Sequence, residues 1–451
     1  MIAHIEEARA GGVQAPTSAS IHGPDAEVAR ASDLRLDRFI DPALLAAAPS
    51  LPAPHGEPST VLLTGGTGYL GRFLLLEWMR RVAAHGGTVV ALVRGADADD
   101  ARRRVFGAIG TADPALTEEF TALAEGHLEV VVGDFGAPSL GLDTATWEAL
   151  AERVDHVVHC GAMVNHVLPY DQLFGPNVVG TAEIARLALT VRRKSIDYVS
   201  TVAVVPQDDG RLLVEDDDVR VAGAERRIGA DAYANGYAVS KWAGEVLLRE
   251  AADLADLPVR VFRSNMILAH SRFRGQYNPV DQFTRLLLSI AETGLAPASF
   301  SADPTGPRAH YDGLPVDFTA EAITRLGAAG RAGFRTFHVL NVAEGGAGLD
   351  DFVDWIAEDR PIERIADYAE WLARFEAALR ALPAEDRHRS VLPLLHSFAR
   401  PAETGAGAAL TADRFREAVR EENVGPGDVP HLDRALIERY LDGFAATGWL
   451  A

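Results

Sequence analysis

The sequence of 451 residues is poor in cysteine and has no long apolar run. Its single cysteine, Cys160, excludes an internal disulfide and indicates a reducing compartment, so we expect a cytoplasmic protein. No apolar stretch approaches the ~20 residues that span a bilayer, so no membrane span is expected. The first residues, MIAHIEEARAGG, are acidic and lack the apolar region of a signal peptide.

Positive charge is scarce relative to negative charge. Lysine and arginine together number 43, against 64 aspartates and glutamates, which gives a net charge of -21. This excess argues against nucleic acid or an anionic membrane as a partner, and it suits a partner with a basic face. The length and the 48% hydrophobic content are sufficient for a large core and about two or three domains.

A glycine-rich turn follows the first strongly apolar stretch. The residues TVLLT, Thr60–Thr64, are predicted to form a buried strand, and YLGRFLLLEWMRRV is predicted to form a helix packed on a sheet. Between them lie Gly65, Gly68 and Gly71, a spacing typical of a turn that brings a pyrophosphate to the N–H groups of a helix start. A tight turn without a ligand is the alternative, because the triplet alone is a weak signal.

The end of the next strand indicates which nicotinamide cofactor binds. The stretch TVVALVRG places Arg94 where dinucleotide-binding units contact the adenosine ribose. An acidic residue there accepts a hydrogen bond from the 2′-hydroxyl of NAD, whereas an arginine accommodates the 2′-phosphate of NADP. We therefore expect NADPH. The following basic cluster, Arg102 to Arg104, is read mainly as a solvated helix face.

Strands and helices alternate from Thr60 onward. Further predicted strands are HLEVVVGD, VDHVVHCGA, SIDYVST and PVRVFRSN, and further helices are PNVVGTAEIARLAL and YAVSKWAGEVLLREA. This alternation favours an α/β fold of the Rossmann type, with a doubly wound parallel sheet. After about Ser271 the pattern becomes mainly helical, with one strand-like piece, TFHVLNV, and predicts a smaller, helix-rich C-terminal domain.

The predicted domain organisation has three parts. Residues 1–56 are rich in Ala, Pro, Ser and Gly and are typical of a tether, although LRLDRFIDPALLAAA within them is more ordered. Residues 57–270 form the predicted cofactor-binding domain, and a return of the chain to it around residues 310–345 is left open. Residues 271–451 form the predicted second domain, which closes over the first.

The stretch YAVSK carries a proton-donor pattern. Tyr237 and Lys241 are one helical turn apart and share one helix face. The ammonium is expected to lower the pKa of the phenol, so that Tyr237 donates a proton near neutral pH while Lys241 binds the nicotinamide ribose. Thr201 closes the strand SIDYVST, at the edge of the sheet where ligands bind. An ordinary half-exposed helix face is the alternative, because the pattern alone is common.

The sequence resembles the extended short-chain dehydrogenase/reductases, in which the same features occur in the same order: the glycine turn, Arg94, Thr201, Tyr237 and Lys241. Longer stretches resemble the thioester reductase domains that end carboxylic acid reductases and some nonribosomal peptide synthetases: LTGGTGYLGR, MVNHVLPYDQLFGPNVVGT, YANGYAVSKWAGEVLLREA, AHYDGLPVDF and LPLLHSF. The similarity is closest to the terminal domain of carboxylic acid reductases, including the lead-in LRLDRFID.

The resemblance implies a defined reaction. An acyl group arrives as a thioester on the phosphopantetheine arm of a carrier protein, NADPH delivers hydride to the carbonyl, and the hemithioacetal collapses to an aldehyde. Thr201 and Tyr237 would hold the oxyanion and, with Lys241, form the catalytic set. The resemblance also assigns Asp134 to adenine and places Asn177 near the active site. The complete implied cofactor set is Thr64, Gly65, Gly68, Tyr69, Leu70, Gly71, Arg94, Arg104, Asp134, Asn177, Tyr237 and Lys241.

Asn265, in the stretch VFRSNMILA, departs from the family pattern, which commonly has an aspartate there. The resemblance implies that this residue couples docking of the carrier arm to placement of the nicotinamide, and so limits the enzyme to one hydride transfer. Asparagine keeps the size but removes the charge. We therefore expect a relaxed gate and some further reduction of aldehyde to alcohol, with a silent change as the alternative.

Three other functions remain open. A fatty acyl-CoA reductase would differ mainly in using CoA thioesters, and an epimerase or dehydratase of the same superfamily would lack the NHVLPY stretch. A non-catalytic NADP-sensing protein would typically lose the tyrosine–lysine pair. The sequence shows no carrier motif and no adenylation region. We therefore expect no activation of free acids. The resemblance implies a donor that is met either in trans or on a carrier domain joined through the tether, residues 1–56, and it implies that residues 271–451 bind the substrate and the carrier.

Several other polar residues have ordinary interpretations. His159 and Cys160 end a predicted buried strand without a neighbouring cluster, so no metal site is expected. His166 is expected to shape the cofactor pocket. The acidic stretch VEDDDVR, Val214–Arg220, is read as a solvated loop, with part of a lid or a carrier-docking edge as the alternative.

Overall fold

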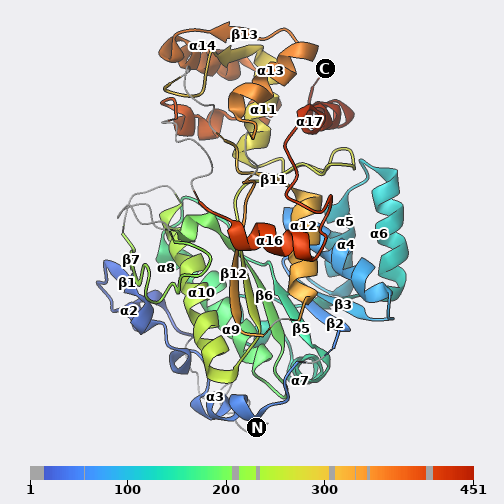
Figure 1. Ribbon diagram of the computed structural model, residues 1–451, viewed down its shortest axis with the longest axis vertical. Helices are drawn as coiled ribbons and strands as arrows, with labels where there is room; N and C mark the ends of the chain where they lie inside the picture. The colour runs from blue at the N-terminus through green and yellow to red at the C-terminus, as the bar shows by residue number, and fades with distance from the viewer. Residues whose placement is uncertain are drawn as a thin grey trace. The chain divides into compact units, whose positions relative to one another are not determined.

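The computed structural model divides the chain into two compact units, which are described separately (Figure 1). The first unit comprises Met1–Ile109, Phe120–Ser264 and Ile323–His338, and the second comprises Gly110–Glu119, Asn265–Ala322 and Val339–Ala451. The structure describes residues 15–54, 56–205, 213–229, 234–303, 310–330, 332–342, 346–402 and 410–450.

The first unit is built on a seven-stranded parallel sheet with the strand order β12-β8-β6-β5-β2-β3-β4. The chain runs outward from β2 in both directions, which is the doubly wound order, and its switch point lies between β2 and β5. The predicted Rossmann-type fold is therefore confirmed. The strands are β2 (Thr60–Thr64), β3 (Thr88–Val93), β4 (Leu128–Val132), β5 (His156–His159), β6 (Ser195–Thr201), β8 (Val259–Ser264) and β12 (Phe334–Val339).

Helices alternate with these strands, as their apolar periodicity predicts. They are α4 (Tyr69–Ala83), α5 (Ala98–Ile109), α6 (Pro114–His127), α7 (Thr144–Arg153), α8 (Tyr170–Leu173), α9 (Gly180–Ala188), α10 (Asn235–Ala255) and α12 (Val316–Ala328). Shorter turns are η4 (Pro138–Gly141), η6 (Val202–Val204) and the π-helical η5 (Phe174–Val179). Within the described part of the chain, no helix combines the length and apolarity needed to cross a membrane.

Part of the predicted tether forms short elements that belong to the first unit. These are α2 (Ser18–His22), β1 (Val28–Arg30), η1 (Ala31–Asp33), η2 (Leu36–Arg38), α3 (Pro42–Ala47) and η3 (Ala48–Ser50). β1 pairs with β7 (Glu225–Arg227) in a separate two-stranded antiparallel sheet. Leu34, Leu36 and Ile40 are buried. Residues 1–14 and residue 55 lie outside the described residues, and the predicted domain boundaries stay predictions.

The second unit is mainly helical, as predicted for the residues after Ser271. Its core is rich in aromatic side chains, including Phe283, Phe352, Trp371 and Tyr440. The parallel pairs β9 with β11 and β10 with β13 are its short strands. The elements are β9 (Ile267–Leu268), α11 (Gln282–Thr293), β10 (Leu295–Pro297), β11 (Leu314–Pro315), α13 (Leu349–Asp359), β13 (Glu363–Ile365), α14 (Tyr368–Ala381), α15 (Ala384–Arg389), η7 (Leu392–Phe398), α16 (Asp413–Glu421) and α17 (Arg434–Ala446).

Candidate active site

The predicted glycine turn joins β2 to α4 beside the switch point of the sheet. Gly65 has a φ of +79°, and a Cβ atom there would lie 2.7 Å from the backbone nitrogen of Gly161. A Cβ atom on Gly71 would lie 2.0 Å from the carbonyl oxygen of Gly65, so only glycine lets α4 pack against the turn. Gly68 is exposed at the start of α4, where backbone N–H groups favour an anion.

The side chains next to the glycine turn support it. The Thr64 hydroxyl is buried, 2.7 Å from Nδ1 of His159, and it accepts the Gly161 N–H at 3.1 Å. Leu70 is buried in α4, whereas Tyr69 is half-buried with its ring edge-on to a neighbouring phenylalanine. Thr64 therefore ties β2 to β5. Direct cofactor contacts of Thr64, Tyr69 and Leu70 stay predictions.

The structure brings together the two arginines predicted to bind the cofactor, Arg94 and Arg104. Arg94 is exposed directly after β3, and the guanidinium of Arg104 on α5 donates a hydrogen bond to its carbonyl oxygen. Asp134 follows β4 and accepts the Gly136 N–H through Oδ1 at 3.0 Å. Because β2, β3 and β4 are parallel neighbours, the glycine turn, Arg94 and Asp134 lie along one edge of the sheet.

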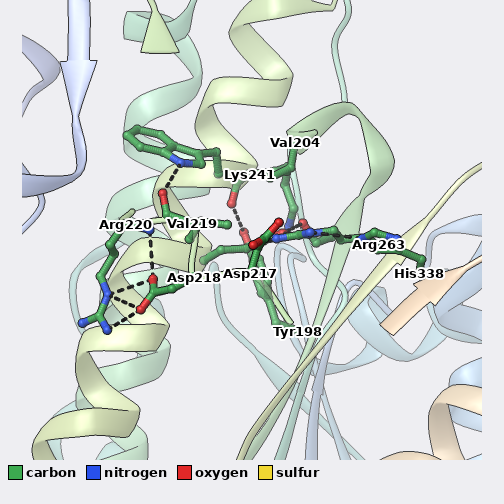
Figure 2. A network of polar contacts seen from close by, with 12 residues as sticks. Tyr198, Val204, Asp217, Asp218, Val219, Arg220, Lys241, Arg263 and His338 are labelled. Carbon is green, nitrogen blue, oxygen red and sulfur yellow. Dashed lines mark hydrogen bonds and ion pairs between the residues drawn. The ribbon is translucent and has the colours of Figure 1, made fainter. Parts of the chain in front are cut away.

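Tyr237 and Lys241 lie on α10, which packs on β6. Lys241 is only 1% exposed, and its ammonium lies 3.8 Å from the centroid of the Tyr198 ring. Figure 2 shows Tyr198 below Lys241, with the Tyr198 hydroxyl directed to the Lys241 carbonyl oxygen at 3.5 Å. Among the described residues none accepts a hydrogen bond from the Lys241 ammonium, so its donors are available to a ligand.

Burial sets the protonation of this pair. It lowers the pKa of Lys241 to about 7, although Cys160 and Glu245 act in the opposite direction. Burial also raises the pKa of Tyr237 above its usual value, and Cys160 adds to the increase. Our expectation that the ammonium lowers the pKa of the phenol is therefore wrong, because desolvation of the phenolate dominates. Tyr237 stays a neutral hydrogen-bond donor near neutral pH, and Lys241 is the group that titrates there.

Thr201 is the last residue of β6 and is half-buried. Its hydroxyl oxygen accepts the Ala203 N–H at 3.2 Å, which leaves the hydroxyl hydrogen to be donated. Ser200 faces the opposite side of the strand, as the alternation of side chains requires, and donates to Glu245 at 2.6 Å. Of the two hydroxyls, only that of Thr201 is thus free of a carboxylate partner among the described residues.

A buried polar network behind Lys241 was missed by the sequence analysis. Glu245, one helical turn after Lys241, and Arg263 on β8 are both completely buried, with Nη2 and Oε2 separated by 2.7 Å. Nη1 of Arg263 lies 3.1 Å from Nε2 of His338 (Figure 2). The backbone N–H of His338 donates to the Glu215 carboxylate at 2.8 Å. The available signal was the glutamate four residues after the lysine, a spacing that also occurs on ordinary helix surfaces.

Asn177 lies in the π-helical turn and joins two segments of the site. Its Oδ1 accepts the Met163 N–H at 2.7 Å, and its Nδ2 donates to the Met163 carbonyl at 3.1 Å and to Ser240 Oγ at 2.9 Å. Both amide hydrogens are therefore used within the protein. The predicted contact of Asn177 with the cofactor stays a prediction and would have to use Oδ1.

Two residues with ordinary sequence interpretations lie close to the catalytic pair. The His166 ring centroid is 5.8 Å from that of Tyr237. Cys160 interacts electrostatically with Lys241, and burial raises the pKa of its thiol to about 12. No cluster of three or more His, Cys, Asp or Glu side chains suited to a metal ion occurs in the part of the chain that the structure describes.

The acidic stretch 214–220 differs from the solvated loop that we expected. Glu215 and Val219 are buried, and the Val219 carbonyl accepts the indole N–H of Trp242 at 3.4 Å. Asp218 and Arg220 form an ion pair of 2.7 Å (Figure 2). The expectation of a solvated loop was wrong for Glu215 and Val219, which are four residues apart and pack inward, whereas the other residues of the stretch are exposed or half-buried. Asn265 follows β8 directly and is exposed, and its gating role stays a prediction.

Comparison with known proteins identifies the family. Residues 63–323 match the model of an NAD-binding family described as male sterility protein. The carboxylic acid reductase of Segniliparus rugosus is 55% identical over 453 residues, which cover 99% of this chain and 38% of the relative. The isonitrile lipopeptide synthase of Mycobacterium tuberculosis is 48% identical over 96% of this chain and 18% of its own length. The chain thus spans well under half of these curated relatives.

A solved structure agrees with these relatives over nearly the whole chain. The reductase domain of a nonribosomal peptide synthetase from Mycobacterium tuberculosis superimposes with a TM-score of 0.86 at 47% identity, covering 94% of this chain and 100% of that domain. The chain therefore belongs to the thioester reductases of the extended short-chain dehydrogenase/reductase superfamily, the group that includes these reductase domains, and it is an oxidoreductase.

Proposed function

We propose that this chain releases an acyl group from a phosphopantetheine thioester as an aldehyde, with NADPH as the hydride donor. The observation that carries the proposal is the placement of Thr201 at the carboxyl end of β6, against which α10 packs with Tyr237 and the buried Lys241. Two hydroxyl donors at a ligand-binding sheet edge suit a carbonyl oxygen that acquires negative charge.

The residues of the first unit fit NADPH. A Cβ atom at Gly65 or Gly71 would overlap the backbone, so the turn is built for close approach, and the start of α4 attracts the pyrophosphate. Arg94 and Arg104, which contact one another through a carbonyl, would hold the 2′-phosphate. Lys241 would bind the nicotinamide ribose through its ammonium donors. NADPH supplies one hydride to the carbonyl carbon.

The chain's own residues stabilise the charge that this addition creates. As the thioester carbonyl carbon gains the hydride, its C=O π electrons move to oxygen, which accepts hydrogen bonds from Thr201 and Tyr237. The raised pKa of Tyr237 keeps its hydroxyl protonated for this role. The tetrahedral species then re-forms C=O and breaks the C–S bond, and the departing thiolate, a stable leaving group, takes up a proton.

Carrier proteins and CoA share the phosphopantetheine arm, so both are candidate donors. We favour a carrier protein, because the carboxylic acid reductase and the synthetase relatives align with this chain over nearly its full length.

Asn265 in place of the family aspartate leads us to propose that part of the aldehyde is reduced further to the alcohol. A second hydride would then be consumed for each alcohol formed.

The proposal is tested with a panel of acyl thioesters on pantetheine, on CoA and on a carrier protein. NADPH oxidation is followed together with the aldehyde and alcohol formed. Aldehyde formed in step with NADPH oxidation, faster from the carrier than from CoA, supports the proposal. Equal rates from the carrier and from CoA favour an acyl-CoA reductase. If NADPH is oxidised with none of the thioesters, thioester reduction is excluded. A free acid with ATP serves as the negative control.

A further inference from the structure

The lead-in before the main sheet is paired with a strand from the segment between Thr201 and Tyr237. β1 and β7 form an antiparallel ladder, in which Ala29 is completely buried. Backbone hydrogen bonds of 2.8 Å extend the ladder, from the Ala31 N–H to the Ala224 carbonyl and from the Ile228 N–H to the Glu27 carbonyl. In Figure 1 the two strands lie close to α2, which contacts β1. The paired residues are Val28 with Arg227, Ala29 with Arg226 and Arg30 with Glu225.

β7 in turn holds the two segments that carry the catalytic hydroxyls. The Arg226 guanidinium donates to the Val204 carbonyl at 3.0 Å, and Val204 ends the short turn that begins directly after Thr201. The Asn235 side-chain amide donates to the Arg227 carbonyl at 2.9 Å. Asn235 is the first residue of α10, half a turn before Tyr237. Both catalytic segments are therefore attached to the same three-residue strand.

The geometry of the ladder explains how β7 serves both sides. Along an antiparallel strand, successive residues direct their N–H and C=O groups alternately toward and away from the partner. Ile228 bonds to the lead-in, so the neighbouring Arg227 directs its carbonyl away from β1, where Asn235 meets it. Pairing with β1 and attachment to α10 thus use opposite edges of β7.

The lead-in also supports the other side of the catalytic helix. The His22 side chain is buried, with Nδ1 at 3.0 Å from Asp33 and Nε2 at 3.1 Å from the Tyr170 hydroxyl. Tyr170 starts α8 directly after the loop that contains His166. The His166 ring faces Tyr237, and its carbonyl accepts the Ala234 N–H at 3.0 Å.

We propose that β1 of the lead-in is a positioning element of the reductase, and that it acts through β7 on Thr201 and Tyr237. The proposal rests on the proposed thioester reduction for its catalytic consequence. Glu225 and Arg227 are exposed, so β7 has little buried surface of its own, and a short strand without a partner is marginally stable. Without β1, β7 would no longer hold the Thr201 and Tyr237 hydroxyls in a fixed position relative to one another.

The first test introduces a charge into the ladder of the full chain. Ala29→Asp places a carboxylate at a fully buried position and opposes pairing of β1. We expect kcat to fall about tenfold or more, because hydroxyl donors that are out of place stabilise the transition state less. The Kd for NADPH should change by less than about twofold, since the glycine turn is carried by β2 and α4. The control, Arg30→Ala with Glu225→Ala, removes only an exposed ion pair and should leave kcat within about twofold.

A disulfide provides the rescue. Val28 and Arg227 form a non-hydrogen-bonded pair, whose Cα atoms are typically about 4.5 Å apart, within the range that a disulfide bridges. In the Ala29→Asp background, Val28→Cys with Arg227→Cys should restore kcat when oxidised and lose it again when reduced. The native Cys160 thiol, with a pKa of about 12, is too weakly ionised to compete for exchange.

Hydrogen exchange separates failure of this inference from failure of the proposed function. If the unmodified chain reduces no thioester, the function is wrong, and the amide exchange of residues 201–204 and 234–238 still tests the positioning. Faster exchange of both segments in Ala29→Asp, reversed by the disulfide, supports the inference. Unchanged exchange overturns it. If the unmodified chain is active, an unchanged kcat in Ala29→Asp overturns it equally.

Discussion

Arg263 and Glu245 form an ion pair in which neither side chain has any exposed surface, and Glu245 lies one helical turn after Lys241. Glu245 also accepts the Ser200 hydroxyl at 2.6 Å. The same carboxylate therefore anchors the residue beside Thr201 and places a negative charge near the Lys241 ammonium. Glu245 thus connects the buried ion pair to the end of β6, and it partly offsets the effect of burial on the charge of Lys241.

Breaking the pair should be costly. Glu245→Gln leaves the buried Arg263 charge unpaired, and we expect a loss of about 3–5 kcal/mol in the free energy of unfolding. Adding Arg263→Met removes the stranded charge and should recover most of this loss. Urea unfolding of the two single variants and the double variant measures the coupling. Additive losses, with no recovery in the double variant, would show that the two side chains do not act as a pair.

Lys241 should titrate close to neutral pH. Its pKa in the folded protein, about 7, is below the usual 10.5, so its stabilising contribution is complete above 10.5 and is lost as the pH falls through 7. Ribose binding has the opposite dependence on pH. It needs the ammonium form of Lys241, which prevails only below about pH 7. The kcat/KM for NADPH should therefore fall about tenfold per pH unit above that value, since this ratio reports the free enzyme.

The titration can be observed directly, because the chain has only two lysines, Lys194 and Lys241. Lysine labelled with ¹³C at Cε should give two signals, which the Lys194→Arg variant assigns. Burial also lowers the pKa of Lys194 to about 7, so it is the matched internal comparison. NADPH should shift the Lys241 signal and its titration, and leave Lys194 unaffected. A Lys241 signal that does not titrate between pH 6 and about 9 would refute the lowered pKa.

Cofactor preference should depend on the two arginines that the structure brings together. Arg94→Ala and Arg104→Ala each remove a charged hydrogen-bond donor to the 2′-phosphate, and we expect about tenfold to a hundredfold weaker NADPH binding. Binding of NADH, which lacks the phosphate, should change little. Arg102→Ala is the matched control, because this side chain stacks on Phe106 at 4.7 Å. Equal losses for NADPH and NADH would place the arginines elsewhere than at the phosphate.

Position 265 should control the second reduction. Asn265→Asp restores the charge of the family residue, and we expect it to lose activity on a free aldehyde while keeping activity on an acyl thioester. A bias of about tenfold needs only about 1.4 kcal/mol between two conformers. The measurement compares both substrates in both proteins. Aldehyde reduction that is equal in the two, or absent from both, would show that position 265 is not the gate.

The strands and helices of the first unit were predictable because their apolar periodicity is strong. The stretch SIDYVST coincides with β6, and YAVSKWAGEVLLREA lies wholly within α10. The glycine turn was predictable because Gly65 and Gly71 satisfy local geometry that the sequence encodes directly. For the same reason, the sequence alone was sufficient to assign Thr201 to a sheet edge and Tyr237 and Lys241 to one helix face.

Interactions between distant segments could not be predicted. β1 and β7 are three residues long and are separated by almost two hundred residues, so neither carries a periodic signal of its own. Glu245 and Arg263 lie on different elements, and only packing reveals that both are buried. The pKa of Tyr237 was predicted in the wrong direction, because the lysine four residues away is visible in sequence whereas desolvation is a property of the folded site.

The most direct test of the proposed mechanism is a single-turnover reaction of the unmodified chain and of Tyr237→Phe with NADPH and an acyl-phosphopantetheine thioester. We predict that the unmodified chain releases aldehyde as NADPH is oxidised. Tyr237→Phe should lose about a hundredfold or more in rate while binding NADPH with nearly unchanged affinity, because the lost donor acts on the transition state. A near-normal rate in Tyr237→Phe, or no oxidation of NADPH by the unmodified chain with any thioester, would contradict the mechanism.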